Sequence, residues 1–262
     1  MDLLYAVVIG LIQGVAEWLP ISSKTQIMLV STHLNIPPST GYTLGLFMEA
    51  ASVAAALIYF RHVYRQVLRG FLGDAVGRMW LKYIVVTTLT TAAFGVPLYY
   101  ISKNTLIGAA AGWLMAALGV VVILNGVVLQ RARNRAGLKD FTNMSLRDMF
   151  LVGVAQALSV VPGVSRSGTT TTTLLLLGYK PEEAFKASFI LVPVAGLGAA
   201  ALTYLDLGRA VLTQEALVAL AVGTLMSIAT IEILMKFAKK SQVVLVNIVV
   251  GILALLGGLL AI

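Results

Sequence analysis

The sequence contains no cysteine, and only 11% of its residues are charged. The absence of cysteine excludes disulfides, thiolate metal ligands and a cysteine nucleophile. Charge is scarce because apolar residues dominate: Ala, Val, Ile, Leu, Met, Phe, Trp and Tyr together make up 59% of the chain. This composition is typical of a chain that is surrounded by lipid rather than by water, so we expect an all-α integral membrane protein.

Several segments are long and apolar enough to cross roughly 30 Å of hydrocarbon. We expect about six full transmembrane helices, near residues 42–60, 83–101, 107–129, 184–204, 214–235 and 243–261. The first 19 residues include Asp2, Gln13 and Glu17 and lack a basic start. We therefore expect them to belong to the mature fold rather than to a cleaved signal peptide.

The formal net charge of the chain is +8. A basic chain can bind nucleic acid, but in an apolar chain Lys and Arg more commonly fill cytoplasmic loops, so we expect no nucleic-acid partner. Basic residues gather in three loops, 61–82, 131–147 and 236–240, whereas the alternate loops hold only Lys103 and Arg209. This bias predicts a multi-pass protein of the plasma membrane with cytoplasmic basic loops and both termini outside.

One stretch of the sequence occurs twice, and a single constant offset in residue number relates the two copies. Gln13 and Ser22 in the first copy correspond to Gln156 and Ser165 in the second. Each copy is apolar, is broken in its middle by Pro and Ser, and is long enough for two short helices. A doubled unit with interrupted helices predicts two halves that meet around a shared site near the bilayer midplane.

We interpret residues 1–33 and 148–178 as two re-entrant helical hairpins. Three full spans separate them, so the second copy would be upside down relative to the first. The expected fold is a single membrane domain with an inverted-topology repeat, made of repeat one (1–130), a linker (131–147) and repeat two (148–262). The broken hairpin tips would meet inside the bilayer, where protein or a wet cavity must cover them.

The two tips carry the polar residues of the repeat. Gln13 and Glu17 are four residues apart and therefore project from one face of a helix. In the second copy, a Gly- and Ser-rich turn at Ser165 leads into a helical run, so the backbone N–H groups of Gly168 and Thr169 are expected near its start. Free N–H groups and the positive end of a helix dipole favour an anion, phosphate above all.

Arg166 strengthens this interpretation. A guanidinium inside a membrane is costly unless it is paired, and its planar fork matches phosphate oxygens. Glu17 is its expected resting partner, or else the holder of a metal. The alternative is a structural Glu17–Arg166 ion pair that only ties the two halves together, but pairing alone would not require the nearby Ser22, Ser23 and Ser167.

These residues carry a resemblance to a known family. The run 162–168, Pro-Gly-Val-Ser-Arg-Ser-Gly, together with Gln13-x-x-x-Glu17-x-x-Pro20-x-Ser22-Ser23, resembles the undecaprenyl-diphosphate phosphatase family of the bacitracin-resistance type. The resemblance implies a membrane hydrolase that removes the terminal phosphate of a polyprenyl diphosphate at the outer face. Its product would be the monophosphate carrier lipid that is recycled in cell-envelope biogenesis.

Four positions depart from the family pattern. The family usually shows Ser-Ser-Thr-Gly-His where this chain has Ser-Ser-Lys-Thr-Gln at 22–26. Gln26 cannot transfer a proton near neutral pH, so any role of the family histidine is absent here, whereas Lys24 could bind phosphate. Glu49 stands where relatives tend to carry Gln or His. It could bind metal, pair with Arg166 or Lys24, or be a protonated carboxyl within the helix bundle.

The expected mechanism follows from charge. A diphosphate carries up to three negative charges, so we expect Arg166, Lys24 and a divalent cation, Mg²⁺ or Ca²⁺, held by Glu17. Either Ser23 or a metal-bound water attacks the terminal phosphorus, with Glu17 as base or metal ligand. The predicted site thus has catalytic Glu17, Ser23 and Arg166, phosphate-binding Ser22, Lys24, Ser165, Ser167, Gly168 and Thr169, and supporting Gln13, Gln26, Glu49 and Gln156.

Other interpretations remain at this point. A transporter or flippase of a phosphate-bearing lipid or organic anion would also combine an inverted repeat with broken helices. A structural scaffold leaves the intramembrane charges unexplained, and a homodimer is an open option for the oligomeric state. His33 and His62 are expected to be surface residues rather than catalysts.

Overall fold

The computed structural model describes residues 3–238, 240 and 242–260, and the regular structure of these residues is helical. The elements are α1 (Leu3–Ala16), α2 (Ser23–His33), α3 (Pro38–Met48), η1 (Glu49–Ser52), α4 (Val53–Tyr59), α5 (Arg61–Gly70), α6 (Ala75–Leu106), α7 (Ala111–Arg133), η2 (Phe141–Asn143), α8 (Leu146–Leu158), α9 (Arg166–Leu176), α10 (Pro181–Ile190), α11 (Val192–Leu207), η3 (Gly208–Val211), α12 (Gln214–Ala238) and α13 (Gln242–Leu260).

Five helical segments are long and apolar enough to span a membrane: Pro38–Tyr59, Ala75–Leu106, Ala111–Arg133, Pro181–Val211 and Gln214–Phe237. They confirm an all-α, multi-pass membrane protein. The sixth expected span, 243–261, coincides with α13, and residue 261 lies outside the described residues. The described apolar part of α13, Val244–Leu260, is shorter than any of these five spans.

Local sequence signals define several helix starts. Asp74 caps α6 by accepting a hydrogen bond of 2.6 Å from the Gly77 N–H. Ser145 and Asp148 form a capping box at the start of α8, in which each side chain accepts from the other residue's backbone N–H. Such caps satisfy N–H groups that have no partner within the helix.

The repeat is visible in the helix boundaries. The first residues of α8, α9 and α10 are offset from those of α1, α2 and α3 by the same interval that relates Gln156 to Gln13. The packing is reciprocal: α1 of the first half packs on α12 of the second, α8 of the second packs on α6 of the first, and α7 packs along α13. The first helix of each half is therefore held by the other half.

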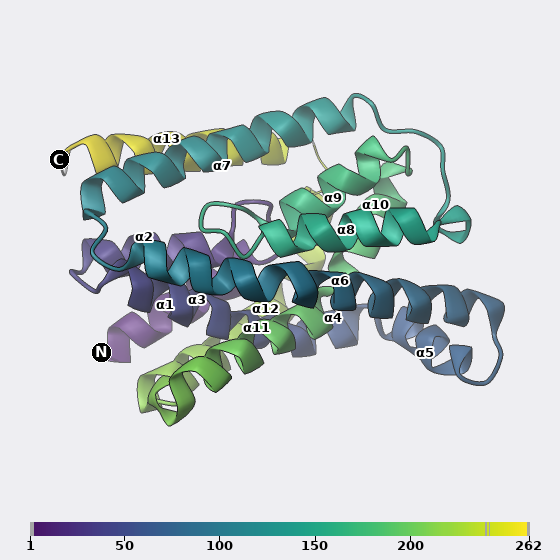
Figure 1. Ribbon diagram of the computed structural model, residues 1–262, viewed down its shortest axis with the longest axis horizontal. Helices are drawn as coiled ribbons and strands as arrows, with labels where there is room; N and C mark the ends of the chain where they lie inside the picture. The colour runs from purple at the N-terminus through teal and green to yellow at the C-terminus, as the bar shows by residue number, and fades with distance from the viewer. Residues whose placement is uncertain (1–2, 239, 241, 261–262) are drawn as a thin grey trace.

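Two irregular turns lie inside the molecule. We call residues 17–25, which connect α1 to α2 and include the start of α2, the first tip, and residues 159–169, which connect α8 to α9 and include the start of α9, the second tip. In Figure 1, α1 starts at the left end and α8 at the right, and the two tips lie between those ends. The tips touch directly, because the Gly163 N–H donates a 2.9 Å hydrogen bond to Thr25 Oγ1.

Buried aromatic packing supports the first tip. Trp18, next to Glu17, is fully buried, and its ring lies 5.9 Å from that of Phe189 on α10. A large side chain locked in the core restricts the backbone around it. The position of Glu17 is therefore set by packing as well as by its own polar contacts.

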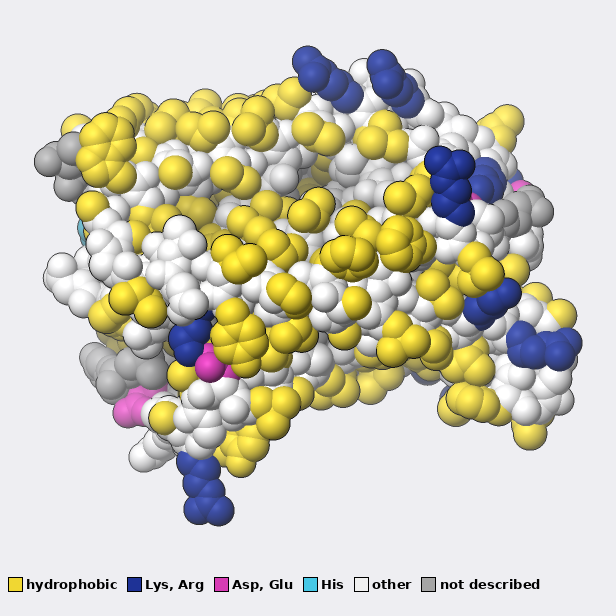
Figure 2. All heavy atoms as spheres, viewed as in Figure 1, with side chains coloured by type: hydrophobic (Ala, Val, Ile, Leu, Met, Phe, Trp, Pro, Cys, Tyr) yellow, Lys and Arg dark blue, Asp and Glu magenta, His cyan; other side chains and the backbone are white. Residues whose placement is uncertain are grey.

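Charged side chains are distributed unevenly over the surface. On the face in Figure 2, most Lys and Arg side chains lie over the right half, and apolar side chains cover much of the rest. The right end holds α5 and the connection from α7 to α8, whereas both chain ends, the α6–α7 turn and η3 lie toward the left end (Figure 1). The basic loops thus gather toward one end of the molecule, and their placement in the cytoplasm stays a prediction.

Candidate active site

Glu17 is the centre of the polar contacts between the two tips. Its Oε2 accepts hydrogen bonds from Gln13 Nε2 at 2.9 Å and from Ser23 Oγ at 2.7 Å. Its Oε1 pairs with Nη2 of Arg166. Gln13 and Glu17 thus point the same way, as expected from their spacing, and Arg166 is the resting partner of Glu17.

Arg166 is the first residue of α9, and only 7% of it is exposed. Its Nε lies 3.9 Å from Oε2 of Glu49, and neither Nε nor Nη1 has a hydrogen-bond partner among the described residues. A guanidinium buried between two carboxylates stays charged. Its unused N–H groups give it capacity for an additional oxygen ligand such as a phosphate.

The serines of the first tip have different surroundings. Ser23 starts α2 and its hydroxyl faces Glu17, whereas the Ser22 hydroxyl is bonded to Thr25 Oγ1 at 2.8 Å. Ser22 also has a φ of 61°, an uncommon backbone conformation for a residue other than glycine. The sharp reversal at Ser22 turns Ser23 back toward α1, which brings a hydroxyl and a carboxylate together.

Lys24 is nearly completely buried, with 2% of its surface exposed. Its Nζ donates a hydrogen bond of 3.1 Å to the backbone carbonyl of Val164 in the second tip. The Lys24 side chain therefore contacts the second half of the molecule, and the Arg166 side chain likewise contacts the first half. The site contains positive charge contributed by both tips.

The serines of the second tip organise the start of α9. Ser165 accepts a 3.2 Å hydrogen bond from the Gly168 N–H and lies 3.3 Å from Ser167 Oγ. Ser167 in turn donates to the Leu19 carbonyl at 3.3 Å, and Thr169 donates to the Ser165 carbonyl at 3.0 Å. Because Ser165 caps the helix, the Gly168 N–H is not free, contrary to the expectation from the sequence.

A small polar pocket lies between the tips, with a volume of about 10 Å³. This is room for roughly one water molecule. A phosphate can enter only if side chains move, and the Arg166 pairs with the carboxylates are the contacts in its way. The polar pocket is lined by Ala16, Glu17, Leu19, Ser22, Ser23, Lys24, Glu49, Ser165, Arg166 and Ser167.

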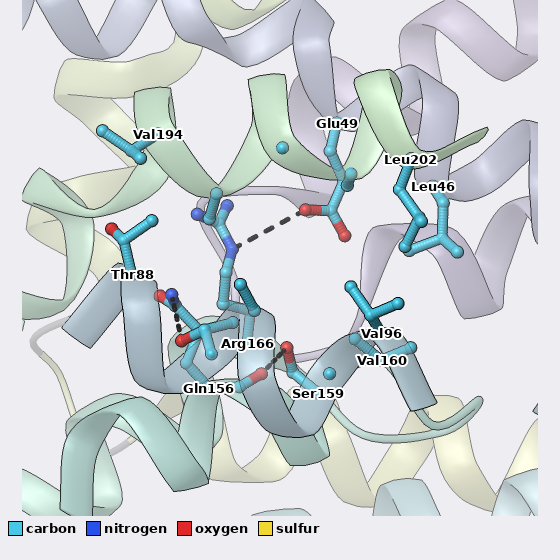
Figure 3. Close-up of a pocket in the computed structure, with 16 residues that line it drawn as sticks. Leu46, Glu49, Thr88, Val96, Gln156, Ser159, Val160, Arg166, Val194 and Leu202 are labelled. Atoms are coloured by element: carbon cyan, nitrogen blue, oxygen red, sulfur yellow. Dashed lines mark hydrogen bonds and ion pairs between the residues drawn. The ribbon is translucent and has the colours of Figure 1, made fainter. Parts of the chain in front are cut away.

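A larger apolar cavity of about 140 Å³ adjoins the polar pocket. Glu49 and Arg166 line both spaces, and Figure 3 shows their side chains facing each other across the cavity. The rest of its wall comes from α3, α6, α8 and α11 and from Ser159 and Val160 of the second tip, and includes Gly95, Val194 and Leu202. An apolar space beside a charged one suits an amphipathic ligand.

Two predicted supporting residues, Gln26 and Gln156, lie outside the lining of the polar pocket. Gln26 donates to the Ile21 carbonyl at 3.0 Å and does not line the polar pocket, so it stabilises the turn of the first tip. Gln156, the repeat counterpart of Gln13, donates to Thr91 Oγ1 at 2.9 Å and lines the apolar cavity. Equivalent glutamines therefore have different surroundings. Gly168 and Thr169 also lie outside the lining of the polar pocket.

Two buried serines, Ser52 and Ser227, were not predicted from the sequence. Ser52 accepts a 3.4 Å hydrogen bond from Gln13 Nε2 and lies 3.0 Å from Ser227 Oγ, which ties η1 to α1 and α12. The sequence feature that could have indicated Ser52 is its position three residues after Glu49 in an otherwise apolar span. His33 and His62 are exposed, as expected.

The contacts of Glu17 bear on the expected divalent cation. Both of its oxygens are engaged, and a cation beside it would face Arg166 and Lys24. Within the described part of the chain, no group of three His, Cys, Asp or Glu side chains could hold a metal ion. This donor set does not fit the resident Mg²⁺ or Ca²⁺ that the sequence predicts at Glu17.

Comparison with known proteins agrees with this geometry. The profile of the family described as bacitracin resistance protein BacA matches residues 6–256. The chain belongs to this family. Among BacA-family relatives, it is 65% identical to the undecaprenyl-diphosphatase of Pyrobaculum aerophilum, over 100% of this chain and 99% of the relative. It is 41% identical to the undecaprenyl-diphosphatase of Saccharolobus solfataricus, over 99% and 96% of the two chains.

Proposed function

We propose that the protein is a polyprenyl-diphosphate phosphatase, which releases inorganic phosphate and leaves the monophosphate carrier lipid. The observation that carries this proposal is the contact of Ser23 with Glu17 directly beside Arg166, a guanidinium with unused donors. Relatives over the full chain length are named undecaprenyl-diphosphatase. The chemistry is hydrolysis of a phosphoanhydride bond.

In this proposal Ser23 is the nucleophile. Its Oγ attacks the terminal phosphorus while Glu17 Oε2 accepts its proton, and the bond to the bridging oxygen breaks as the polyprenyl monophosphate leaves. Water then attacks the phosphoserine and releases inorganic phosphate and free Ser23. The competing route, direct attack by water with Glu17 as base, uses the same side chains without a covalent intermediate.

The phosphates are bound by charge from both tips. Arg166 Nε and Nη1 and the Lys24 ammonium face the developing negative charge, and the hydroxyls of Ser165 and Ser167 line the same pocket. Electrostatic stabilisation of this kind is the main contribution to phosphoryl-transfer catalysis. The apolar cavity beside Arg166 accepts the first isoprene units, which explains why an apolar space adjoins a charged one.

The architecture is, in this proposal, one domain of two inverted halves with re-entrant hairpins at α1–α2 and α8–α9. Three observations support it: the helix starts of the two halves recur at one constant offset, α1 and α8 each pack on the other half, and the two hairpins start from opposite ends (Figure 1). The basic loops are then cytoplasmic, and the polar pocket opens to the outer face of the plasma membrane.

Release of inorganic phosphate tests this function. Purified protein in detergent, with a series of polyprenyl diphosphates of increasing length, is expected to release phosphate, and Glu17→Gln to release almost none. The rival function, a transporter or flippase of a phosphate-bearing lipid, predicts binding without release, even with divalent cations added. The length series would also define the substrate class.

A further inference from the structure

Lys24 and Glu49 carry opposite charges, and their side chains line the same polar pocket. They come from separate elements, α2 and η1, with the whole of α3 between them in the chain. Exposure is 2% for Lys24 and 6% for Glu49. The two residues therefore place one buried positive and one buried negative charge in a single pocket.

The surroundings of the two residues make them interdependent. Lys24 Nζ donates to the Val164 carbonyl, Glu49 Oε2 lies 3.9 Å from Arg166 Nε, and the two oppositely charged side chains line one small pocket. A buried charge without an opposite charge is strongly unfavourable in a membrane protein. Each of the two charges thus makes the burial of the other tolerable.

The backbone conformation at Glu49 differs from that of the α-helices on either side of it. Glu49 begins η1, a 3-10 turn within the otherwise α-helical span Pro38–Tyr59. Gly196 of α11 packs so closely that an added Cβ would lie 2.8 Å from the Glu49 carbonyl oxygen. A 3-10 interruption in a long helix commonly marks a functional position.

We propose that Lys24 supplies the positive charge that a divalent cation would otherwise bring to the substrate diphosphate, and that Glu49 balances Lys24 and Arg166 while the site is empty. This inference rests on the proposed phosphatase function. An ammonium has three donors, and the structure shows Lys24 using one of them for Val164, so two can bind phosphate oxygens. Phosphatase turnover then needs no added divalent cation.

A double-mutant cycle of thermal unfolding tests the pairing without reference to activity. Lys24→Thr and Glu49→Gln are each expected to lower the unfolding midpoint in detergent, and the double variant to recover most of the loss. Lys236→Thr, which removes an exposed pair with Glu232, is the matched control and should leave the midpoint unchanged. Losses that simply add would overturn the pairing.

Metal dependence tests the role of Lys24. In excess EDTA the wild type is expected to keep its rate of phosphate release, whereas Lys24→Thr/Glu49→Gln falls about tenfold or more and recovers on addition of Mg²⁺. Binding of Mn²⁺, followed by EPR with a non-hydrolysable polyprenyl diphosphonate, should be detected for the double variant and not for the wild type. A wild type that loses its rate in EDTA, or that binds Mn²⁺ equally well, would overturn the proposal.

Failure of the proposed function would give a different result. The wild type would then release no phosphate with or without Mg²⁺, while the unfolding cycle and the Mn²⁺ measurement would still decide whether Lys24 and Glu49 compensate each other and stand in place of a metal.

Discussion

Ser23 Oγ donates a 2.7 Å hydrogen bond to Oε2 of Glu17, although a reversal of chain direction separates the two residues. The same carboxylate pairs with Arg166 through its other oxygen. One side chain thus contacts both the candidate nucleophile from the first tip and the phosphate-binding cation from the second. The predictions below test that arrangement and its surroundings.

Replacing Ser23 by Ala removes the proposed nucleophile and should lower kcat at least about 100-fold, with little change in the unfolding midpoint. Steady-state phosphate release measures the loss. Ser31→Ala is a control from the same helix, because Ser31 contacts Tyr5 far from the polar pocket. Near-normal turnover of Ser23→Ala would favour direct attack by water.

Arg166→Lys keeps the charge but loses the planar fork that can hold two phosphate oxygens. We expect a loss of about 100-fold or more in kcat/KM. The measurement is phosphate release at substrate concentrations above and below KM. Turnover equal to that of the wild type would show that Arg166 does not bind phosphate in the way proposed here.

Glu17→Ala combined with Arg166→Ala should be no less active than the poorer single variant, because the two residues act as a unit. Each single change removes the hydrogen-bonded partner of a buried charge and should reduce the free energy of unfolding by about 3–5 kcal/mol, whereas the double variant should lose less. Kinetics and denaturant unfolding together check this. Multiplicative losses of activity would instead indicate independent roles.

Gly95→Leu places a bulky side chain in the apolar cavity beside Val160. Because this space is proposed to accept the first isoprene units, the variant should raise KM for polyprenyl diphosphates several-fold and change KM for inorganic pyrophosphate much less. Ala93→Leu on the exposed face of α6 is the matched control. An equal effect of both variants would argue against prenyl binding in the cavity.

Single cysteines at Asn104 and Asn134 test the orientation in a protein that has no native cysteine. Both positions are exposed, at the ends of α6 and α7. On intact cells a membrane-impermeant maleimide should label the cysteine at 104 and spare the one at 134, because the basic loops are expected in the cytoplasm. The reverse pattern would place the site's opening on the cytoplasmic side.

Several features could be predicted because they depend on local composition or on a repeated pattern. Membrane insertion follows from hydropathy, and the grouping of Glu17, Ser23 and Arg166 at one place follows from polar residues in segments that lipid would not accept. Other features could not. Gln26 and Gln156 occupy conspicuous positions in the two motifs, yet their side chains lie outside the polar pocket because backbone and hydroxyl partners are nearer.

By itself the amino-acid sequence determined that the protein lies in a membrane, that it is helical, that it contains a doubled unit and that it belongs to this family. Each of these depends on residue type and spacing along the chain. Only the tertiary structure decided which charges meet. Lys24, Glu49 and Arg166 come from three separate elements, and they share one pocket because the two tips contact each other and η1 packs on α1, α11 and α12. Such contacts depend on the packing of distant helices, for which a linear pattern contains no direct signal.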